Sequence, residues 1–358
     1  MTTLHYILDR NKNNFDLIRL FAALAVIFGH SFALHPHDGQ IEPIIQLLKF
    51  TYSGALAVDI FFFLSGILVT SSFCQTRSYT RFCLMRIARI WPGLAICLLT
   101  TITIVGPTVT TLAIKDYFTS PQTINYIWEN LKITNIVFAL PGVFKDNHYK
   151  EAVNGSLWTL PTEVRCYVMV FIIGALGFLK SRVKTILAGL MTASLLFLSP
   201  QFLGYFKANQ DTLRMPLLFL LGIVCYINRE KIIIDYRLSL FALPFAIAFN
   251  PNDFGKFAFY IVFINTILVI AKLPWLRRFQ PPGDYSYGIY IYGFVVQQFI
   301  AHKFPELTSY PSLLVSIPAT CGLAIISWEY IEKPALNYAR SLSSAYERYR
   351  MPDSLNRV

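Results

Sequence analysis

The stretch Phe15-Asp-Leu-Ile-Arg19-Leu-Phe-Ala-Ala-Leu-Ala-Val-Ile-Phe-Gly-His30-Ser-Phe-Ala-Leu34 decides what kind of fold this sequence can adopt. It has the roughly 20 residues that an α-helix needs to cross a bilayer. On such a helix, Arg19 and His30 lie about 16 Å apart along the axis and on almost the same face. Ionisable side chains in a bilayer core cost at least about 2.5 kcal/mol each. This stripe therefore predicts a functional site inside a membrane protein.

The composition of the whole chain indicates the same class. Of its 358 residues, 55% are hydrophobic and only 14% are charged, which is more apolar material than one soluble core requires. We therefore expect an all-α polytopic membrane bundle of about ten transmembrane helices. The expected spans are 15–34, 55–73, 90–113, 162–179, 185–205, 213–228, 238–250, 254–271, 286–304 and 311–331.

The basic residues predict how this bundle is oriented. If the N-terminus is cytoplasmic, 20 of the 31 Lys and Arg residues fall on the cytoplasmic side, as the positive-inside rule requires. Both termini are therefore expected in the cytoplasm. We expect one membrane domain over residues 1–340, with an extracytoplasmic cap at 114–161, and a basic cytoplasmic tail at 341–358.

Two classes of partner are not expected. The net charge of +11 follows from the basic cytoplasmic loops, which anionic lipid attracts, so the lipid bilayer is a partner and nucleic acid is not. The six cysteines have neither the spacing of a zinc site nor that of a disulfide framework. No metal is expected.

Three polar residues are predicted near the outer ends of their spans: His30, Asp59 and Glu163. Asp59 could accept a hydrogen bond from one imidazole nitrogen of His30 and raise the basicity of the other nitrogen, as a general base requires. The alternative for Asp59 is a pairing that only stabilises packing. Glu163 could belong to the same site, or it could complement the dipole of a helix that starts at Pro161. In the same span as Asp59, Ser65 and Gly66 are expected to allow close helix contact and not to take part in chemistry.

A second group is predicted near the inner side of the membrane. Arg86 and Arg89 are three residues apart and share one helical face, where two guanidiniums can clamp a phosphate. The alternative is ordinary anchoring by basic residues at the cytoplasmic boundary. Ser286 and Tyr287 open another span at the depth of Arg19. The alternative for these two is an interfacial aromatic belt.

Six motifs, in one order from about residue 14 to 336, resemble the acyltransferase-3 family of integral membrane acyltransferases. Each motif is weak by itself, but the order is specific. The motifs are Arg19-x10-His30, Val58-Asp59-x-Phe-Phe-x-Leu-Ser65-Gly66, the Arg86/Arg89 pair before Trp91-Pro92, Ser156-Leu-Trp158-x4-Glu163, Ser286-Tyr287-x2-Tyr290 and Trp328-x-Tyr330-x-Glu332-Lys333-Pro334.

The resemblance implies an O-acyltransferase of about ten membrane helices in a bacterial inner membrane. Its members typically move an acetyl or other short acyl group from acyl-CoA to a sugar hydroxyl, on acceptors such as O-antigen, exopolysaccharide or another surface glycan. Arg19 and His30 match the family's essential arginine and histidine. The pair Arg86 and Arg89 matches its basic loop motif, and Glu163 and Ser286/Tyr287 match later conserved positions. The Pro-Thr before Glu163 departs from the family pattern.

Together these inferences predict a site with two ends. The cytoplasmic end would bind the phosphates and pantetheine of acetyl-CoA, whose charge cannot enter hydrocarbon, through Arg19, Arg86, Arg89, Ser286 and Tyr287. At the outer end, His30, supported by Asp59 or Glu163, would act as general base on a carbohydrate hydroxyl. A covalent acyl-histidine is equally compatible with the sequence. Trp158 and Glu163 are expected near the sugar.

Two other classes of function remain open at this point. A proton-coupled secondary transporter would also contain buried Arg, His, Asp and Glu residues, although the sequence has no inverted repeat or paired helix breaks. A non-catalytic flippase or scaffold in polysaccharide assembly is the other alternative.

Overall fold

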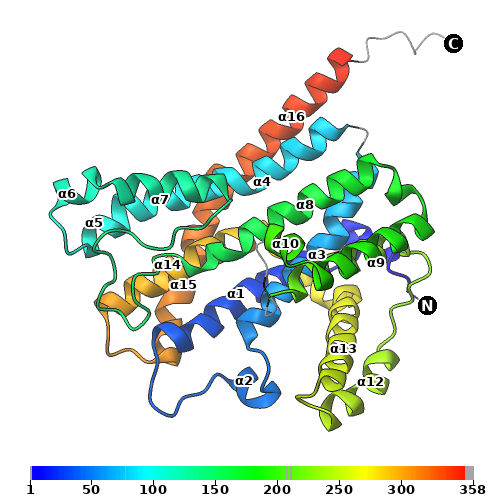
Figure 1. Cartoon of the computed structure of the whole chain (residues 1–358), viewed down its shortest axis with the longest axis horizontal. Helices are drawn as coiled ribbons and strands as arrows, with labels where there is room; N and C mark the ends of the chain where they lie inside the picture. The colour runs from blue at the N-terminus through cyan, green and yellow to red at the C-terminus, as the bar shows by residue number, and fades with distance from the viewer. Residues whose placement is uncertain (1, 77, 207–208, 210–211, 351–358) are drawn as a thin grey trace.

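Figure 1 shows the computed structural model of the chain, which describes residues 2–76, 78–206, 209 and 212–350. Residues 351–358 of the expected tail lie outside this range. The described residues are helical, with two isolated β-bridges and no strand, which confirms the all-α prediction. The helices are α1 (Phe15–Leu34), α2 (Pro43–Leu48), α3 (Ser53–Gln75), α4 (Tyr79–Thr100), α5 (Gly106–Val109), α6 (Ile114–Thr119), α7 (Pro121–Lys132), α8 (Leu160–Ala175), α9 (Arg182–Leu198), α10 (Pro200–Tyr205), α11 (Arg214–Ile227), α12 (Arg237–Ala248), α13 (Asp253–Lys272), α14 (Ser286–Lys303), α15 (Ser309–Ser327) and α16 (Lys333–Arg350), joined by short turns η1 (Tyr6–Leu8), η2 (Arg10–Lys12), η3 (Thr101–Val105), η4 (Gly155–Thr159), η5 (Phe178–Lys180), η6 (Pro274–Phe279) and η7 (Trp328–Glu332).

Six helical segments within the described residues are long and apolar enough to cross a membrane. Two shorter apolar helices, α11 and α12, accompany them. These lengths and compositions agree with an integral membrane protein, while the expected ten crossings and cytoplasmic termini stay predictions. The six segments are Phe15–Leu34, Ser53–Gln75, Tyr79–Val109, Gly155–Ala175, Asp253–Lys272 and Ser309–Glu347.

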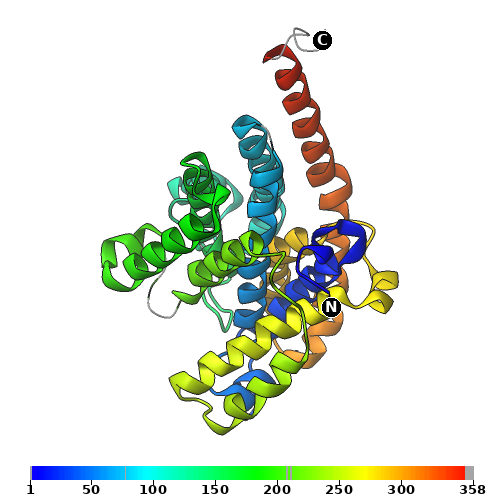
Figure 2. The ribbon, with the colours of Figure 1, turned by 90° about the vertical axis from the view of Figure 1, so that its right-hand side faces the viewer.

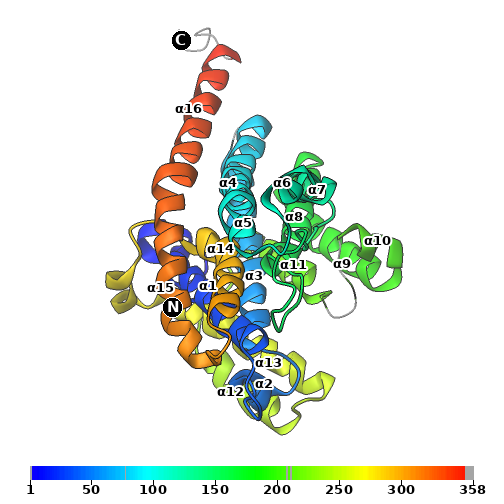
Figure 3. The same cartoon turned by 90° about the vertical axis from the view of Figure 1, so that its left-hand side faces the viewer.

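Two of these segments are longer than the apolar runs that predicted them. The helix expected at 90–113 begins at Tyr79, and π-helical turn η3 joins α4 to α5. The helix expected at 311–331 continues through π-helical turn η7 into α16. Hydropathy marks only the part of a helix that lipid could cover, so the polar extensions were missed. In Figures 1 and 3, α16 and the first part of α4 stand side by side at one end of the molecule.

The helices α1, α3 and α14 pack against one another and form the part of the bundle that carries the site. Helix α11 covers another face of α3, and α8 also contacts α3. The pair α12 and α13 forms a hairpin at one side, which Figure 2 shows in yellow and yellow-green.

The packing of α3 on α11 depends on two glycines. A Cβ atom on Gly66 would lie 2.2 Å from the carbonyl oxygen of Phe219, and one on Gly222 would lie 2.4 Å from the carbonyl oxygen of Phe63. No side chain fits at that distance, so the two backbones touch. This confirms the close helix contact expected at Gly66.

Replacing Gly66 by Ala should therefore destabilise the folded chain by about 1–3 kcal/mol, because the added methyl group forces α3 and α11 apart. Gly322→Ala is the matched control, since a Cβ there meets nothing within 4 Å. Thermal unfolding in detergent, followed by reaction of the buried thiols Cys97 and Cys166 with a maleimide dye, measures both variants. Equal unfolding temperatures for the two would contradict the backbone contact.

Candidate active site

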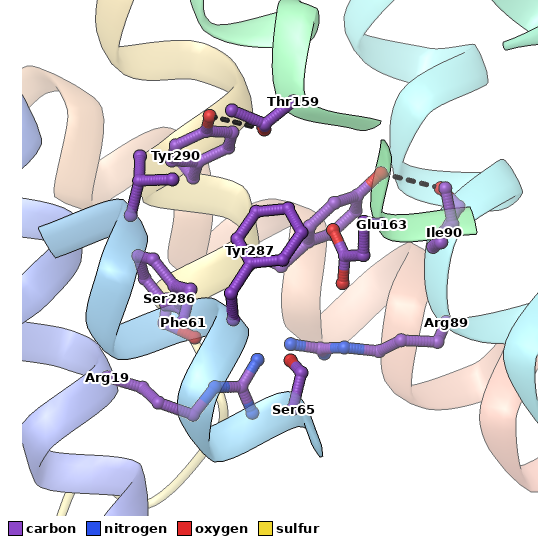
Figure 4. Close-up of a pocket in the computed structure, with 12 residues that line it drawn as sticks. Arg19, Phe61, Ser65, Arg89, Ile90, Thr159, Glu163, Ser286, Tyr287 and Tyr290 are labelled. Carbon is purple, nitrogen blue, oxygen red and sulfur yellow. Dashed lines mark hydrogen bonds between the residues drawn. The ribbon is translucent and has the colours of Figure 1, made fainter. Parts of the chain in front are cut away.

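Six elements of the bundle, α1, α3, α4, η4, α8 and α14, enclose a chamber with an empty volume of about 550 Å³. In Figure 4, the side chains of Arg19 and Arg89 enter from opposite sides and point toward each other, and Tyr290 and Thr159 lie toward the other end. The chamber thus has a cationic end and an end with aromatic and hydroxyl groups. Its lining residues are Arg19, Val58, Phe61, Phe62, Ser65, Arg89, Ile90, Thr159, Glu163, Ser286, Tyr287 and Tyr290.

The two guanidiniums share one carboxylate, that of Asp284 just before α14. The Nη1 atom of Arg19 and the Nη2 atom of Arg89 both lie 2.8 Å from its Oδ2 atom. The Ser286 hydroxyl donates to its other oxygen, Oδ1, at 2.6 Å. Burial would raise the pKa of Asp284, but the two guanidiniums outweigh it and hold this pKa well below its usual range. The carboxylate therefore stays ionised and joins α1, α4 and α14.

A second carboxylate, Glu332 in η7, lies on the other side of Arg89. Its Oε2 atom is 3.7 Å from Nη1 of Arg89, and the Ser327 hydroxyl donates to its Oε1 atom at 2.8 Å. Neither Asp284 nor Glu332 was among the site residues predicted from sequence. The sequence did offer a signal for both. Asp284 stands two residues before the motif that begins at Ser286, and Glu332 is part of the motif that begins at Trp328.

The predicted pair Ser286 and Tyr287 lines the chamber, but both hydroxyls already have partners. Ser286 donates to Asp284, and the Tyr287 hydroxyl donates to the carbonyl oxygen of Ile90 at 2.8 Å. The Tyr287 ring lies under the Arg89 guanidinium, 5.4 Å from its central carbon. These contacts fix α14 against α4 and hold the Arg89 side chain in the chamber.

Arg86 lies outside the chamber, in an adjoining vestibule of about 1150 Å³ empty volume. Arg19, Ser65 and Arg89 line both spaces. The Arg86 guanidinium lies over the ring of Tyr167 at 5.7 Å. Within the described part of the chain no carboxylate forms an ion pair with it, and its buried Nε atom has no hydrogen-bond partner. A half-buried cation without a protein counterion suits an anionic ligand.

Glu163 does not lie at the depth expected for it. It lines the same chamber as Arg89, and the Tyr167 hydroxyl donates to its Oε1 atom. The prediction placed it beside His30 and Asp59, on the assumption that its helix starts at the membrane surface.

The reason is a segment that folds back into the bundle before α8. The side-chain amide of Asn154 donates to the carbonyl oxygen of Ile291 at 2.8 Å, and Thr159 hydrogen-bonds the Tyr290 hydroxyl at 2.6 Å. The last residues of the expected cap are therefore buried beside the middle of α14. This insertion brings Glu163 into the chamber that Tyr287 also lines.

The predicted hydrogen bond between Asp59 and His30 is also wrong. The fully buried Asp59 carboxylate accepts from Nε of Arg214 at 2.9 and 3.1 Å and from the Tyr260 hydroxyl at 2.8 Å. Two residues further on α3, Phe61 lies in the chamber. Asp59 is absent from the chamber lining, and its partners show that it points toward α11 and α13.

His30 lies beyond the aromatic end of the chamber, whose lining does not include it. Its ring meets the ring of Phe294 edge-on at 5.1 Å, and Phe294 is one helical turn after Tyr290. The Nδ1 atom of His30 is buried and has no hydrogen-bond partner among the described residues. Trp158 is half-buried, packs on the core and likewise does not line the chamber.

The structure therefore gathers most of the predicted residues around the chamber and leaves the others at a distance from it. Those at the chamber are Arg19, Arg89, Glu163, Ser286 and Tyr287, with Arg86 in the vestibule, and those outside are His30, Asp59 and Trp158. No group of three or more His, Cys, Asp and Glu side chains within the described ranges could hold a metal ion.

Known proteins resemble this chain over nearly its full length. Residues 12–329 match the acyltransferase-3 family model, described as an acyltransferase domain. The chain is 30% identical over 343 residues to an O-acetyl transferase of Shigella phage Sf6, covering 90% of this chain and 95% of that protein. It is 28% identical over 362 residues to nodulation protein 10 of Rhizobium leguminosarum bv. viciae, covering 93% and 95%. No solved structure matches significantly.

The variant Asp284→Asn should destabilise the folded chain by about 3–5 kcal/mol, because it leaves the Arg19 and Arg89 guanidiniums without their shared counterion. Since the pKa of Asp284 is lowered by folding, its contribution is fully present above about pH 4 and shrinks as the pH falls further. Unfolding in detergent across this pH range tests both statements. The exposed Asp38→Asn variant is the control, and equal stability of the two variants at pH 7 would refute the role of Asp284.

Proposed function

This chain belongs to the acyltransferase-3 family and is an O-acetyltransferase, and from that premise we propose that it carries an acyl group, most often acetyl, from cytoplasmic acyl-CoA to a carbohydrate hydroxyl. One observation carries the proposal. A chamber with two arginines at one end adjoins a basic vestibule, and beyond Tyr290 at its other end the next turn of α14 carries Phe294, which contacts His30. The arrangement suits a ligand with an anionic head and a long thin arm.

The proposed donor site follows from the charges. The phosphates of acyl-CoA need cationic partners because they cannot enter hydrocarbon, and Arg86 and Arg89 are placed at the vestibule to bind them. The pantetheine arm then runs through the chamber along Phe61 and Tyr290, whose rings meet edge-on with centroids 5.9 Å apart and form part of its wall. Arg19 and His30 are about 16 Å apart along α1, and an extended arm can bridge a distance of this order.

The proposed chemistry takes place beyond Tyr290, where the thioester reaches His30. His30 removes the proton of the acceptor hydroxyl while the hydroxyl oxygen attacks the thioester carbonyl carbon. The carbon–sulfur bond then breaks, and the CoA thiolate takes the proton from the imidazolium. The buried, unpaired Nδ1 atom supports a neutral imidazole that is free to accept. Because Asp59 and Glu163 have other partners, His30 performs this role without a carboxylate.

The proposed topology puts the vestibule in the cytoplasm and the acceptor outside, in a multi-pass bacterial inner-membrane protein. Ten crossings with both termini cytoplasmic place residues 114–161 at the outer face as a cap and residues 1–340 in one membrane domain. The basic tail, 341–358, then continues on the side of the donor. In this arrangement Trp158, near the buried end of the cap, lies on the path of an incoming sugar, and Glu163 faces the pantetheine arm in the chamber.

The proposed acceptor is a surface glycan such as O-antigen or an exopolysaccharide. The O-acetyl transferase of Shigella phage Sf6 supports acetyl as the transferred group. The family model that covers residues 12–329 is one of acyltransferases, which favours acyl transfer over the proton-coupled transporter alternative.

Replacing His30 by Ala should lower acetyl transfer at least about a hundredfold, because a general base typically contributes that much or more. The assay supplies labelled acetyl-CoA to sealed inside-out membrane vesicles and measures label in membrane glycans, at matched expression. The exposed loop residue His37, replaced by Ala, is the control and should retain full activity. Full activity of His30→Ala would exclude the proposed base.

The variant Arg19→Lys should raise KM for acetyl-CoA about tenfold, because Lys keeps the positive charge but not the planar fork that binds carboxylate and phosphate together. The same vesicle assay at varied donor concentration gives KM. Arg182→Lys, at an exposed ion pair with Glu230, is the matched control. An unchanged KM for Arg19→Lys would remove Arg19 from the donor site.

A further inference from the structure

One wall of the vestibule is built by residues outside the part of the chain that defines the family. The family match covers residues 12–329, yet Arg10, Lys333, Asn337 and Arg340 line the vestibule as well. Three of these residues lie on α16, which begins after the match ends. The matched residues thus supply the chamber, and α16 supplies further cations around its mouth.

Helix α16 is held so that its polar residues face this space. Leu336 and Ala339 are buried against Ala88 of α4 and form a small apolar cluster. Lys333, Asn337 and Arg340 follow one another at intervals of four and three residues, so they share one helical face. This packing fixes two cationic side chains beside Arg86, which also lines the vestibule.

The added cations have only weak protein partners. Lys333 pairs with Glu329 at 2.7 Å, with side chains 50% and 39% exposed, and Arg10 pairs with Asp16 at 3.3 Å with its own side chain 80% exposed. Arg340 donates to the side-chain oxygen of Asn337 at 3.0 Å. Exposed pairs of this kind contribute little to stability, so a phosphate can readily take the place of the protein partner of each cation. The ion pairs that Asp284 shares with Arg19 and Arg89 are buried, so a phosphate does not readily replace this carboxylate.

We propose that Lys333 and Arg340 of α16, together with Arg10, bind the 3′-phosphate of the donor's nucleotide and so select CoA over dephospho-CoA. The inference rests on the proposed function. With the pantetheine arm in the chamber, the diphosphate lies at Arg19 and Arg89, which line both spaces. The phosphorylated ribose lies at the end of the donor opposite the acyl group. It then reaches the cations that line the vestibule but not the chamber.

The test compares acetyl-CoA with acetyl-dephospho-CoA as donors in inside-out vesicles. Wild type should have a KM about tenfold lower for acetyl-CoA, because two charge-assisted contacts reach the extra phosphate. The double variant Lys333→Ala/Arg340→Ala should raise KM for acetyl-CoA to that of acetyl-dephospho-CoA, with kcat changed less than twofold. The exchange Lys333→Arg/Arg340→Lys, which keeps both charges, should retain most of the preference. The exposed Lys231→Ala variant should behave as wild type.

The outcomes separate this inference from the proposed function. A double variant that transfers acetyl and keeps the wild-type preference would overturn the α16 site while leaving the donor class intact. Equal KM values of wild type for acetyl-CoA and acetyl-dephospho-CoA would also overturn the α16 site and leave the donor class intact. Wild type that transfers from neither donor would overturn the proposed function, and the α16 site with it.

Discussion

The shared carboxylate of Asp284 is the interaction on which the rest of the site depends. A guanidinium removed from water loses several kcal/mol of solvation unless an anion is close, and here two of them, on α1 and α4, meet one carboxylate at 2.8 Å each. The same ion pairs tie α14 to both helices. Because the charges must stay partly accessible to avoid a larger penalty, the helices leave a chamber around them instead of closing.

Sequence could predict the helices and most of the inner half of the site, because both follow from local spacing. An ionisable residue inside an apolar run must face something polar, and that rule selected Arg19, while the three-residue spacing of Arg86 and Arg89 selected that pair. It could not select their counterion. Asp284 lies in a loop, where a carboxylate needs no explanation, and only the packing of α14 beside α1 reveals that it is buried.

The errors at Asp59 and Glu163 have a common physical origin. Depth in the membrane can be estimated from position within a span, but the direction in which a side chain points depends on which helices are neighbours. Asp59 is close to the expected depth, yet it faces Arg214 and Tyr260. Glu163 follows a segment whose side chains hydrogen-bond to α14, and an inserted segment of this kind leaves no hydropathy signal.

The separation of the two ends of the site constrains how the reaction can work. Charge is concentrated around Asp284, while His30 is surrounded by Phe294 and apolar backbone and lacks any carboxylate partner within the described residues. An imidazole in such surroundings has no anion to stabilise its protonated form, so protonation is favourable only while a proton is being moved from one reactant to another. The distance along α1 therefore suits the proposed donor, whose anionic head would lie at the arginines, away from the proposed base.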